Sequence, residues 1–205
     1  MDSKSKQKEL QEIAQEVEKC QQCPLYKRAN RGVPGEGNPD ARIMFIGEGP
    51  GYWEDQKGIP FCGAAGNLLD ELLQTIELER EEVFIGNVIK HRPPGNRDPF
   101  PQEIEACRSW LDKQIEIIQP EIIVTLGRFS MAKFLLNTMI SRIHGQSQSV
   151  EFQGRKAMIM PMYHPAAGLR RGEILEDLKT DFLKLGELLK SPPKPEPSRE
   201  QLSLV

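Results

Sequence analysis

The residues best suited to chemistry follow the short apolar run Arg42 to Ile46, which ends in the segment Gly47-Glu48-Gly49-Pro50-Gly51. A run of β-forming residues that stops at glycines and a proline predicts a buried strand leading into a tight loop. In open α/β sheets, ligands bind at the carboxyl ends of strands, and glycines let backbone amides approach them closely. Because Glu48 lies in this loop and Phe61 follows, the segment is better suited to a flat polar ligand than to a phosphate.

Two further polar residues are expected at the same edge of the sheet. Asn87 lies near the end of one predicted strand, and His164 follows another. An amide offers a donor and an acceptor to a planar ligand, and within an apolar strand it costs free energy unless it is paired. The alternatives are that Asn87 caps a neighbouring backbone group and that His164 is structural. A carboxylate, an amide, an aromatic ring and an imidazole at one edge predict a pocket that stacks on and reads a nucleobase.

The cysteines form a second candidate site. Cys20-x-x-Cys23 follows a predicted helix, and Cys107 lies inside another. Two thiolates at this spacing can bind one metal centre, although cysteines are also common as small buried side chains. His91 and Cys62 are the candidates for a fourth ligand, and we favour His91 because Cys62 would draw the glycine-rich loop to the metal. The spacing fits a structural zinc as well as an iron–sulfur cluster.

Strand-like and helix-like segments alternate along the chain, which predicts a mostly parallel sheet with helices on both faces. The segment from Ser141 to Gly154 is expected to form a β-hairpin or a long loop. The predicted strands are Ile43 to Ile46, Val83 to Ile89, Ile122 to Leu126 and Ala157 to Met162; the predicted helices are Gln7 to Lys19, Ala65 to Ile76, Pro101 to Ile118, Ser130 to Asn137 and Ile174 to Leu189.

Length and composition predict one globular domain. The chain has 205 residues, of which 38% are hydrophobic and 28% charged, and we assign the domain to residues 1–190. The proline-rich segment 191–205 is expected to be a disordered tail. The sequence has no run long enough to span a membrane and begins with a charged helix, so we expect a cytoplasmic protein.

The charges are unevenly distributed. A net charge of −3 argues mildly against a nucleic-acid partner. However, acidic residues concentrate between Glu77 and Glu82, whereas basic residues occur at strand ends and loops. These basic residues, which include Arg92, Arg97, Arg142 and Arg170, predict a basic rim beside the pocket or, alternatively, scattered solvated arginines.

At these residues the sequence resembles the uracil-DNA glycosylase superfamily, and most closely its family 4, the iron–sulfur enzymes. The resemblance runs from about Cys20 to about Leu185. It rests on Gly47 to Gly51 with Glu54-Asp55, Gly58-x-Pro60-Phe61-x-Gly63-x-Ala65-Gly66, Asn87-Val88-x-Lys90, Arg92 to Arg97, Ala106-Cys107-Arg108 and His164-Pro165-Ala166-Ala167.

The resemblance implies a three-layer α/β/α sandwich around a four-stranded sheet, and a structural [4Fe-4S] cluster. Cys20, Cys23 and Cys107 match cluster ligands of the family, whereas the position of the remaining family cysteine is occupied by His91. Either His91 binds iron, as a histidine does in a branch of relatives that bind uracil-DNA covalently, or the cluster is incomplete. Cys62 stands where the family has a small aliphatic residue, which favours a packing role.

The resemblance also implies roles for the pocket residues. Phe61 would stack on a flipped uracil, Asn87 would read its edge, and His164 would donate to uracil O2. Glu48 would orient the attacking water, with Glu54 as a second carboxylate. Gly49 and Pro50 would belong to the substrate pocket, and Arg92 and Arg97 would contact the DNA. We expect the loop from Pro165 to Arg171, which carries Leu169 and Arg170, to act as a wedge and phosphate clamp at the duplex.

We therefore predict a monomeric, nucleoid-associated DNA-repair glycosylase that hydrolyses the N-glycosidic bond of uracil and leaves an abasic site. The covalent relatives carry their reactive histidine in an inserted arginine-rich loop, and no such insertion follows Lys90. The alternative is a non-hydrolysing module, covalent or not, that binds uracil or damaged bases in DNA and is held together by a metal cluster. Such a binder would not need the pair Glu48 and His164. A nucleoside hydrolase is a weaker alternative, because the basic rim would then have no purpose.

Overall fold

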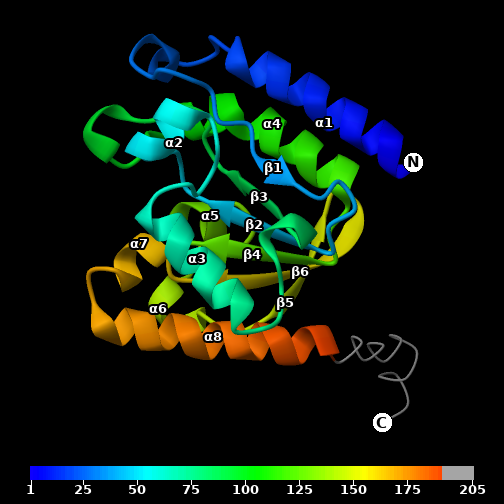
Figure 1. Cartoon of the computed structure of the whole chain (residues 1–205), viewed down its shortest axis with the longest axis vertical. Coiled ribbons are helices and arrows are strands. Elements are labelled where there is room, and N and C mark those ends of the chain that lie inside the picture. The colour runs from blue at the N-terminus through cyan, green and yellow to red at the C-terminus, as the bar shows by residue number, and fades with distance from the viewer. Residues whose placement is uncertain (191–205) are drawn as a thin grey trace.

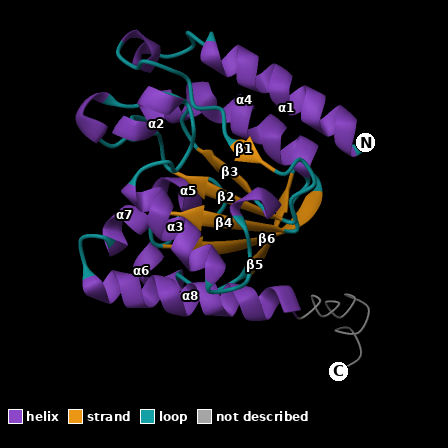
Figure 2. Ribbon diagram, in the orientation of Figure 1, coloured by secondary structure: helices purple, strands orange, loops and turns teal. Residues whose placement is uncertain are grey.

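The computed structural model of the chain describes residues 1–190 and shows helices on both sides of one sheet (Figure 1). The sheet has the strand order β1-β3-β2-β4-β6-β5. Its strands, orange in Figure 2, are β1 (Glu36–Gly37), β2 (Ile43–Gly47), β3 (Phe84–Asn87), β4 (Ile122–Leu126), β5 (Gln148–Phe152) and β6 (Arg155–Met162).

The four predicted strands correspond to β2, β3, β4 and β6, and these four are mutually parallel. The prediction of a four-stranded sheet missed two antiparallel edge strands. β1 has only two residues and therefore no pattern to detect. β5 alternates half-buried and exposed residues and pairs with β6 as a hairpin, which is one of the two alternatives expected for this segment.

Alternate residues of the central strands point to opposite faces, so the sheet has two hydrophobic cores. On one face, Met44 and Ile46 pack with helices α1 (Ser3–Glu18) and α4 (Pro101–Ile118). On the other face, Ile43 and Phe45 pack with α3 (Ala64–Gln74) and α8 (Gly172–Lys190). The result is the expected three-layer α/β/α sandwich, with both faces of the parallel sheet covered.

The long helices agree with the prediction, but the short ones were missed. Asp2 starts α1 four residues early, because its side chain accepts the Ser5 backbone N–H at 2.8 Å. The helix expected from Ser130 is the short α5 (Arg128–Ala132). The segments that were not predicted are α2 (Tyr52–Lys57), α6 (Ile140–Ile143), α7 (Pro165–Gly168) and the 3₁₀ turns η1 (Pro24–Lys27), η2 (Arg80–Glu82) and η3 (Pro94–Asn96).

The segment 191–205, which was expected to be a disordered tail, lies outside the described residues. Within residues 1–190, none of the helices combines the length and the apolar character needed to cross a lipid bilayer.

Candidate active site

A cleft of about 370 Å³ opens at the carboxyl edge of the parallel strands. β2 has β3 on one side and β4 on the other, and this reversal of strand order is where open α/β sheets bind ligands. The structure brings together the predicted pocket residues, which all line the cleft: Glu48, Gly49, Pro50, Glu54, Phe61, Asn87 and His164.

Gly47 lies directly before the cleft residue Glu48 and against Asn87 and Phe61. It is the register partner of Asn87 across β2 and β3. A Cβ atom on Gly47 would lie 2.4 Å from Asn87 Oδ1 and 2.6 Å from Phe61 Cε2. Any side chain here would therefore displace the amide and the ring, so the glycine is required for both to face the cleft.

Phe61 and His164 form adjoining walls. Their rings are nearly parallel, at 23° with centroids 5.4 Å apart. The backbone of Phe61 has a φ of +50°, in the left-handed region that non-glycine residues seldom adopt. Such a conformation persists only where the surroundings hold it.

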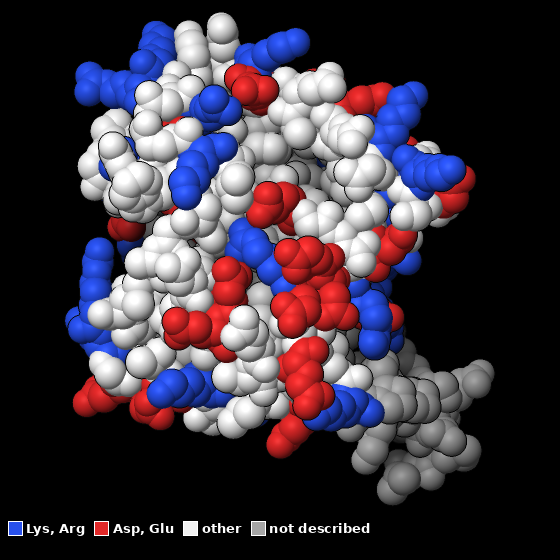
Figure 3. Space-filling model, viewed as in Figure 1, with Lys and Arg blue, Asp and Glu red and all other residues white. Residues whose placement is uncertain are grey.

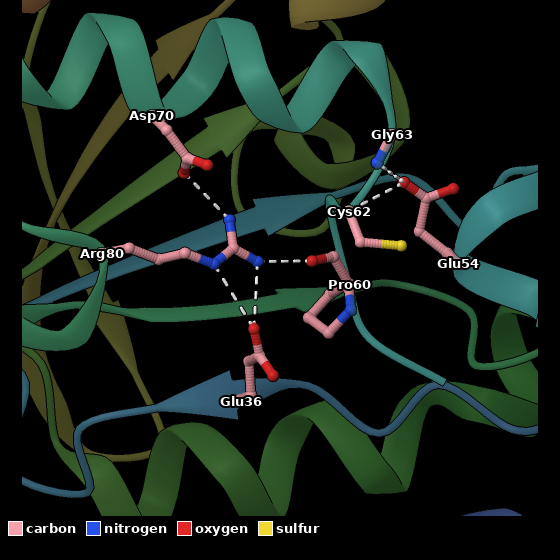
Figure 4. A network of polar contacts seen from close by, with 7 residues as sticks. All are labelled: Glu36, Glu54, Pro60, Cys62, Gly63, Asp70 and Arg80. Atoms are coloured by element: carbon pink, nitrogen blue, oxygen red, sulfur yellow. Dashed lines mark hydrogen bonds and ion pairs between the residues drawn. The ribbon is translucent and has the colours of Figure 1, made fainter. Parts of the chain in front are cut away.

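Two charged side chains hold the loop on either side of Phe61 (Figure 4). Arg80 donates to the Pro60 carbonyl and is itself held by Glu36 and Asp70. Glu54 Oε1 accepts the backbone N–H groups of Cys62 and Gly63, both at 3.1 Å. Because these contacts grip the peptide groups before and after the ring, they supply the restraint that Phe61 needs.

The role predicted for Glu54 was that of a second catalytic carboxylate. The structure places it in the cleft wall but engages one of its oxygens in the loop. Arg80 was not recognised from the sequence, since it lies in an acidic segment, Glu77 to Glu82, that reads as solvated surface.

Asn87 is 2% exposed, and its Oδ1 has no hydrogen-bond partner within residues 1–190. The alternative that this oxygen caps a backbone group is thus not what the structure shows. A buried amide oxygen without a partner lowers the stability of the fold, typically by about 1–3 kcal/mol. Asn87 lines the cleft, so a ligand bound there can supply the missing partner.

Lys90 lies behind Asn87 and is fully buried. Its Nζ donates to the carbonyls of Asn87 and Pro34, at 3.0 and 3.1 Å, and to Gln114 Oε1 at 2.8 Å. All three ammonium protons thereby find acceptors. The sequence showed Lys90 only as part of a motif, and its contacts indicate that it fixes the end of β3.

His164 is held as a neutral donor. Its Nδ1 accepts the Ala166 backbone N–H at 3.1 Å, so the ring proton is on Nε2. Burial lowers the pKa of His164 to about 4. At neutral pH the ring therefore offers an uncharged N–H.

Glu48 reaches across to the start of α5. Its Oε1 accepts the Phe129 backbone N–H at 3.1 Å. Gly127, with a φ of +104°, makes room for it, since a Cβ atom there would lie 2.4 Å from Oε1. Burial raises the pKa of Glu48, and the Phe129 hydrogen bond opposes this effect. Gly127 and Phe129 could not be recognised as site residues from the sequence, because nothing local links them to Glu48.

The residues predicted to contact DNA surround the cleft but differ in availability. Arg97 lines the cleft and forms two hydrogen bonds with the carboxylate of Glu103, at 2.8 and 2.6 Å, so its charge is already paired. Arg170 also lines the cleft, and Leu169 beside it is 53% exposed. Arg92 donates to Asn96 Oδ1 at 2.7 Å.

The predicted metal ligands lie near one another on the α1 side of the sheet. Cys20, Cys23 and Cys107 belong to or pack against one hydrophobic cluster. The thiols of Cys23 and Cys107 share a hydrogen bond, which lowers the pKa of Cys23 to about 6 and raises that of Cys107. Cys107 also accepts the Lys90 backbone N–H, directly before His91.

Cys20 and the buried His91 line one small cavity of about 110 Å³ at the end of α1. The four side chains thus form two adjoining pairs whose sulfur and imidazole donors are those that zinc and iron–sulfur centres use. Across residues 1–190, however, no three such side chains converge closely enough to hold a metal ion. Cys62 lies elsewhere, beside Glu54 in the loop drawn in Figure 4.

Comparison with known proteins identifies the family to which the chain is similar. The profile of the uracil DNA glycosylase superfamily matches residues 34–184. The type-4 uracil-DNA glycosylase of Archaeoglobus fulgidus is 49% identical over 87% of this chain and 92% of its own length. The type-4 uracil-DNA glycosylase of Thermotoga maritima is 45% identical over 83% of this chain and 92% of its own length. A type-5 uracil-DNA glycosylase of Thermus thermophilus is 29% identical over 60% of this chain and 70% of its own.

The matched region contains the whole cleft, from Glu48 to Arg170, and the relatives cover nearly all of the described fold. The chain belongs to the uracil DNA glycosylase superfamily and, within it, to the type-4 family.

Proposed function

We propose that this protein is a uracil-DNA glycosylase that flips uracil out of DNA and hydrolyses its N-glycosidic bond, leaving an abasic site for repair. The observation that carries the proposal is the buried amide oxygen of Asn87, which has no hydrogen-bond partner within residues 1–190, in a cleft lined by Phe61 and His164. The similarity to type-4 uracil-DNA glycosylases over most of the chain supports the same activity.

Recognition rests on Phe61 and Asn87. The phenyl ring offers a flat apolar surface, and the amide pairs with the edge of the base. Cytosine carries an amine where uracil carries O4, so the order of donors and acceptors is reversed at that edge. Since an unmatched buried polar group is costly, the amide discriminates between the two bases.

His164 supports departure of the base. Negative charge develops on uracil O2 as the glycosidic bond breaks, and an Nε2–H donor at that position stabilises it. At neutral pH the ring is uncharged and carries its proton on Nε2, so it can donate at this position. One such donor in a dry site is typically worth about 3 kcal/mol.

Glu48 orients the attacking water. Its carboxylate lies in the cleft, and its raised pKa makes it a better proton acceptor than a solvated glutamate. We assign Glu54 a positioning role, because its Oε1 holds the loop that carries Phe61.

We further propose that Cys20, Cys23, His91 and Cys107 hold a [4Fe-4S] cluster, with zinc as the alternative occupant. Sulfur and imidazole donors suit either group. The bound group would supply a structural cross-link between the loop after α1 and helix α4. We also propose that the protein acts as a monomer in the cytoplasm, associated with the nucleoid.

The test is incubation of the purified protein with an end-labelled oligonucleotide that contains one uracil, followed by hot alkali and a denaturing gel. Scission at the uracil is the expected result. An uncut strand would contradict the proposal. A band that stays retarded in detergent would then indicate covalent binding, and an unretarded strand would remove uracil as the ligand.

A further inference from the structure

Exposed aromatic rings belong to residues that are next in sequence to residues of the cleft. Within residues 1–190, the aromatic side chains that are at least half exposed are Tyr52 (50%), Trp53 (56%) and Phe100 (54%). Tyr52 and Trp53 lie between the cleft residues Gly51 and Glu54, and Phe100 follows the cleft residue Pro99. Large aromatic side chains are usually buried to a greater extent, so this placement calls for a ligand.

Tyr52 and Trp53 form one surface with an arginine. Their rings meet edge to face, at 79° with centroids 5.1 Å apart. The Arg92 guanidinium lies over the Tyr52 ring, 5.1 Å from its centroid. Trp53 rests against the loop that holds Phe61, since its Cδ1 would lie 3.3 Å from a Cβ atom on Gly63.

The arginine of this surface differs from Arg97 at the cleft in how its charge is paired. Within the described residues Arg92 has no carboxylate partner, whereas Arg97 beside Phe100 is paired with Glu103. Acidic side chains gather instead over η2 and the neighbouring part of α3, in the middle of the view in Figure 3. None of the residues from Glu77 to Glu82 lines the cleft.

We propose that Tyr52, Trp53 and Arg92 bind unpaired bases and backbone next to the target nucleotide, so that the protein has a built-in site for single-stranded DNA. This inference rests on the proposed function, and it names the form of the substrate. Surfaces that bind single strands combine positive charge with aromatic rings on which bases stack. In a duplex the flanking bases are already stacked on their neighbours, so these rings gain little from them.

The first test compares kcat/KM on single-stranded and duplex oligonucleotides of the same sequence. For the double variant Tyr52→Ala/Trp53→Ala, we expect a loss of about tenfold to a hundredfold on the single strand. The loss on the duplex should be less than about threefold. Tyr52→Phe/Trp53→Phe should retain most of the activity, because it keeps two aromatic faces. The matched control is Leu183→Ala, which removes a side chain of similar exposure from α8.

Equal losses on both substrates, or no loss on either, would overturn the inference. If the wild-type protein cuts neither substrate, the proposed function fails, and a second measurement still tests the surface. The chain has two tryptophans, and the other one, Trp110, is buried in α4. A uracil-free single strand should therefore quench the fluorescence of Trp53, even in a Trp110→Phe background, whereas a duplex should not. Absence of quenching by the single strand would contradict the site.

Discussion

At the scale of single residues, Asn87 favours substrate recognition but lowers the stability of the free protein. Its amide lies at the end of an apolar strand, and its oxygen has no hydrogen-bond partner among residues 1–190. Lys90 behind it donates to the backbone carbonyl rather than to the side chain. A group that is costly in the free protein becomes useful when a base pairs with it. Functional sites are where such departures from an optimal fold are expected.

Replacing Asn87 by alanine tests this balance. We expect Asn87→Ala to lower kcat/KM on uracil-containing DNA by about a hundredfold or more, because recognition of the base edge is lost. Thermal unfolding should occur at an unchanged or higher temperature, since an unpaired buried oxygen is removed. The measurements are a steady-state assay and a melting curve on the same preparation. A clear fall in melting temperature would show that the amide has a structural partner.

His164 makes a prediction about pH. Burial lowers its pKa to about 4, against an ordinary value of 6.5. Between these values the unfolded chain binds more protons than the folded one. The contribution of His164 to stability is therefore lost as pH falls from about 6.5 towards 4, and is full above that range.

The check is NMR of protein labelled with ¹⁵N-histidine. The His164 signals should show a proton on Nε2 and an unprotonated Nδ1 through neutral pH, with titration only near pH 4. The variant His164→Gln identifies the His164 signals, because these disappear from its spectrum. A midpoint near 6.5, or a proton on Nδ1, would rule out the neutral donor described above.

At the scale of elements, the loop between α2 and α3 is held from both ends. Arg80, from the turn η2, fixes the carbonyl before Phe61, and Glu54, from α2, fixes the two N–H groups after it. The ring is thereby placed before the substrate arrives, which spares the entropy of ordering it during binding.

Two variants distinguish a positioning role of Glu54 from a catalytic one. Glu54→Gln keeps an oxygen that can accept the same backbone hydrogen bonds, whereas Glu54→Ala keeps none. If Glu54 positions the loop, the glutamine variant should retain activity within about tenfold, and the alanine variant should lose about a hundredfold. Comparable losses in both variants would instead identify Glu54 as a carboxylate that takes part in the chemistry.

Arg80 should act through Phe61. We expect Arg80→Ala to reduce kcat/KM about tenfold to a hundredfold in the wild-type background, because the ring loses its placement. In a Phe61→Ala background the same change should cost little, and Arg80→Lys should restore part of the activity. Melting curves for all variants serve as the control. Equal effects of Arg80→Ala in both backgrounds would point to a general loss of structure.

The pattern of apolar residues was enough to predict the four parallel strands, the two helical layers and the edge at which the polar residues meet. It could not predict β1 or α2, which are too short to show a period. The contacts of Glu48 with Gly127 and Phe129, and those of Arg80 with Glu36 and Pro60, link segments far apart in the chain. Such contacts depend on the folded arrangement, so local sequence carries no record of them.

At the scale of the whole molecule, the loop after α1, which contains Cys20 and Cys23, attaches α1 to the rest of the domain. Cys23 contacts Cys107 on α4, and Asn30 donates two hydrogen bonds to the buried Asp55 on α2. The loop after α1 is therefore anchored at both ends. A metal group between these anchors would tighten an arrangement that the side chains already favour.

The ligand set predicts a contrast between two variants. We expect His91→Ala to lose bound iron, measured by visible absorbance and metal analysis, and to unfold at a lower temperature than the wild type. Cys62→Ser should change neither property, because Cys62 lies in the loop next to Glu54. Purification without oxygen keeps the comparison fair. Full iron content in His91→Ala, or loss of iron in Cys62→Ser, would show that His91 is not the fourth ligand.

Figure 3 shows acidic side chains gathered in the middle of the view, and their position relative to the cleft bears on how the molecule meets its target. Acidic side chains between Glu77 and Glu82 lie away from the cleft, and Arg170 and Arg92 lie at or beside it. We expect the arginines at and beside the cleft to draw this side of the protein towards a polyanion, although the net charge of the chain is −3. The fraction of collisions that are productive should thus decrease as salt shortens the Debye length.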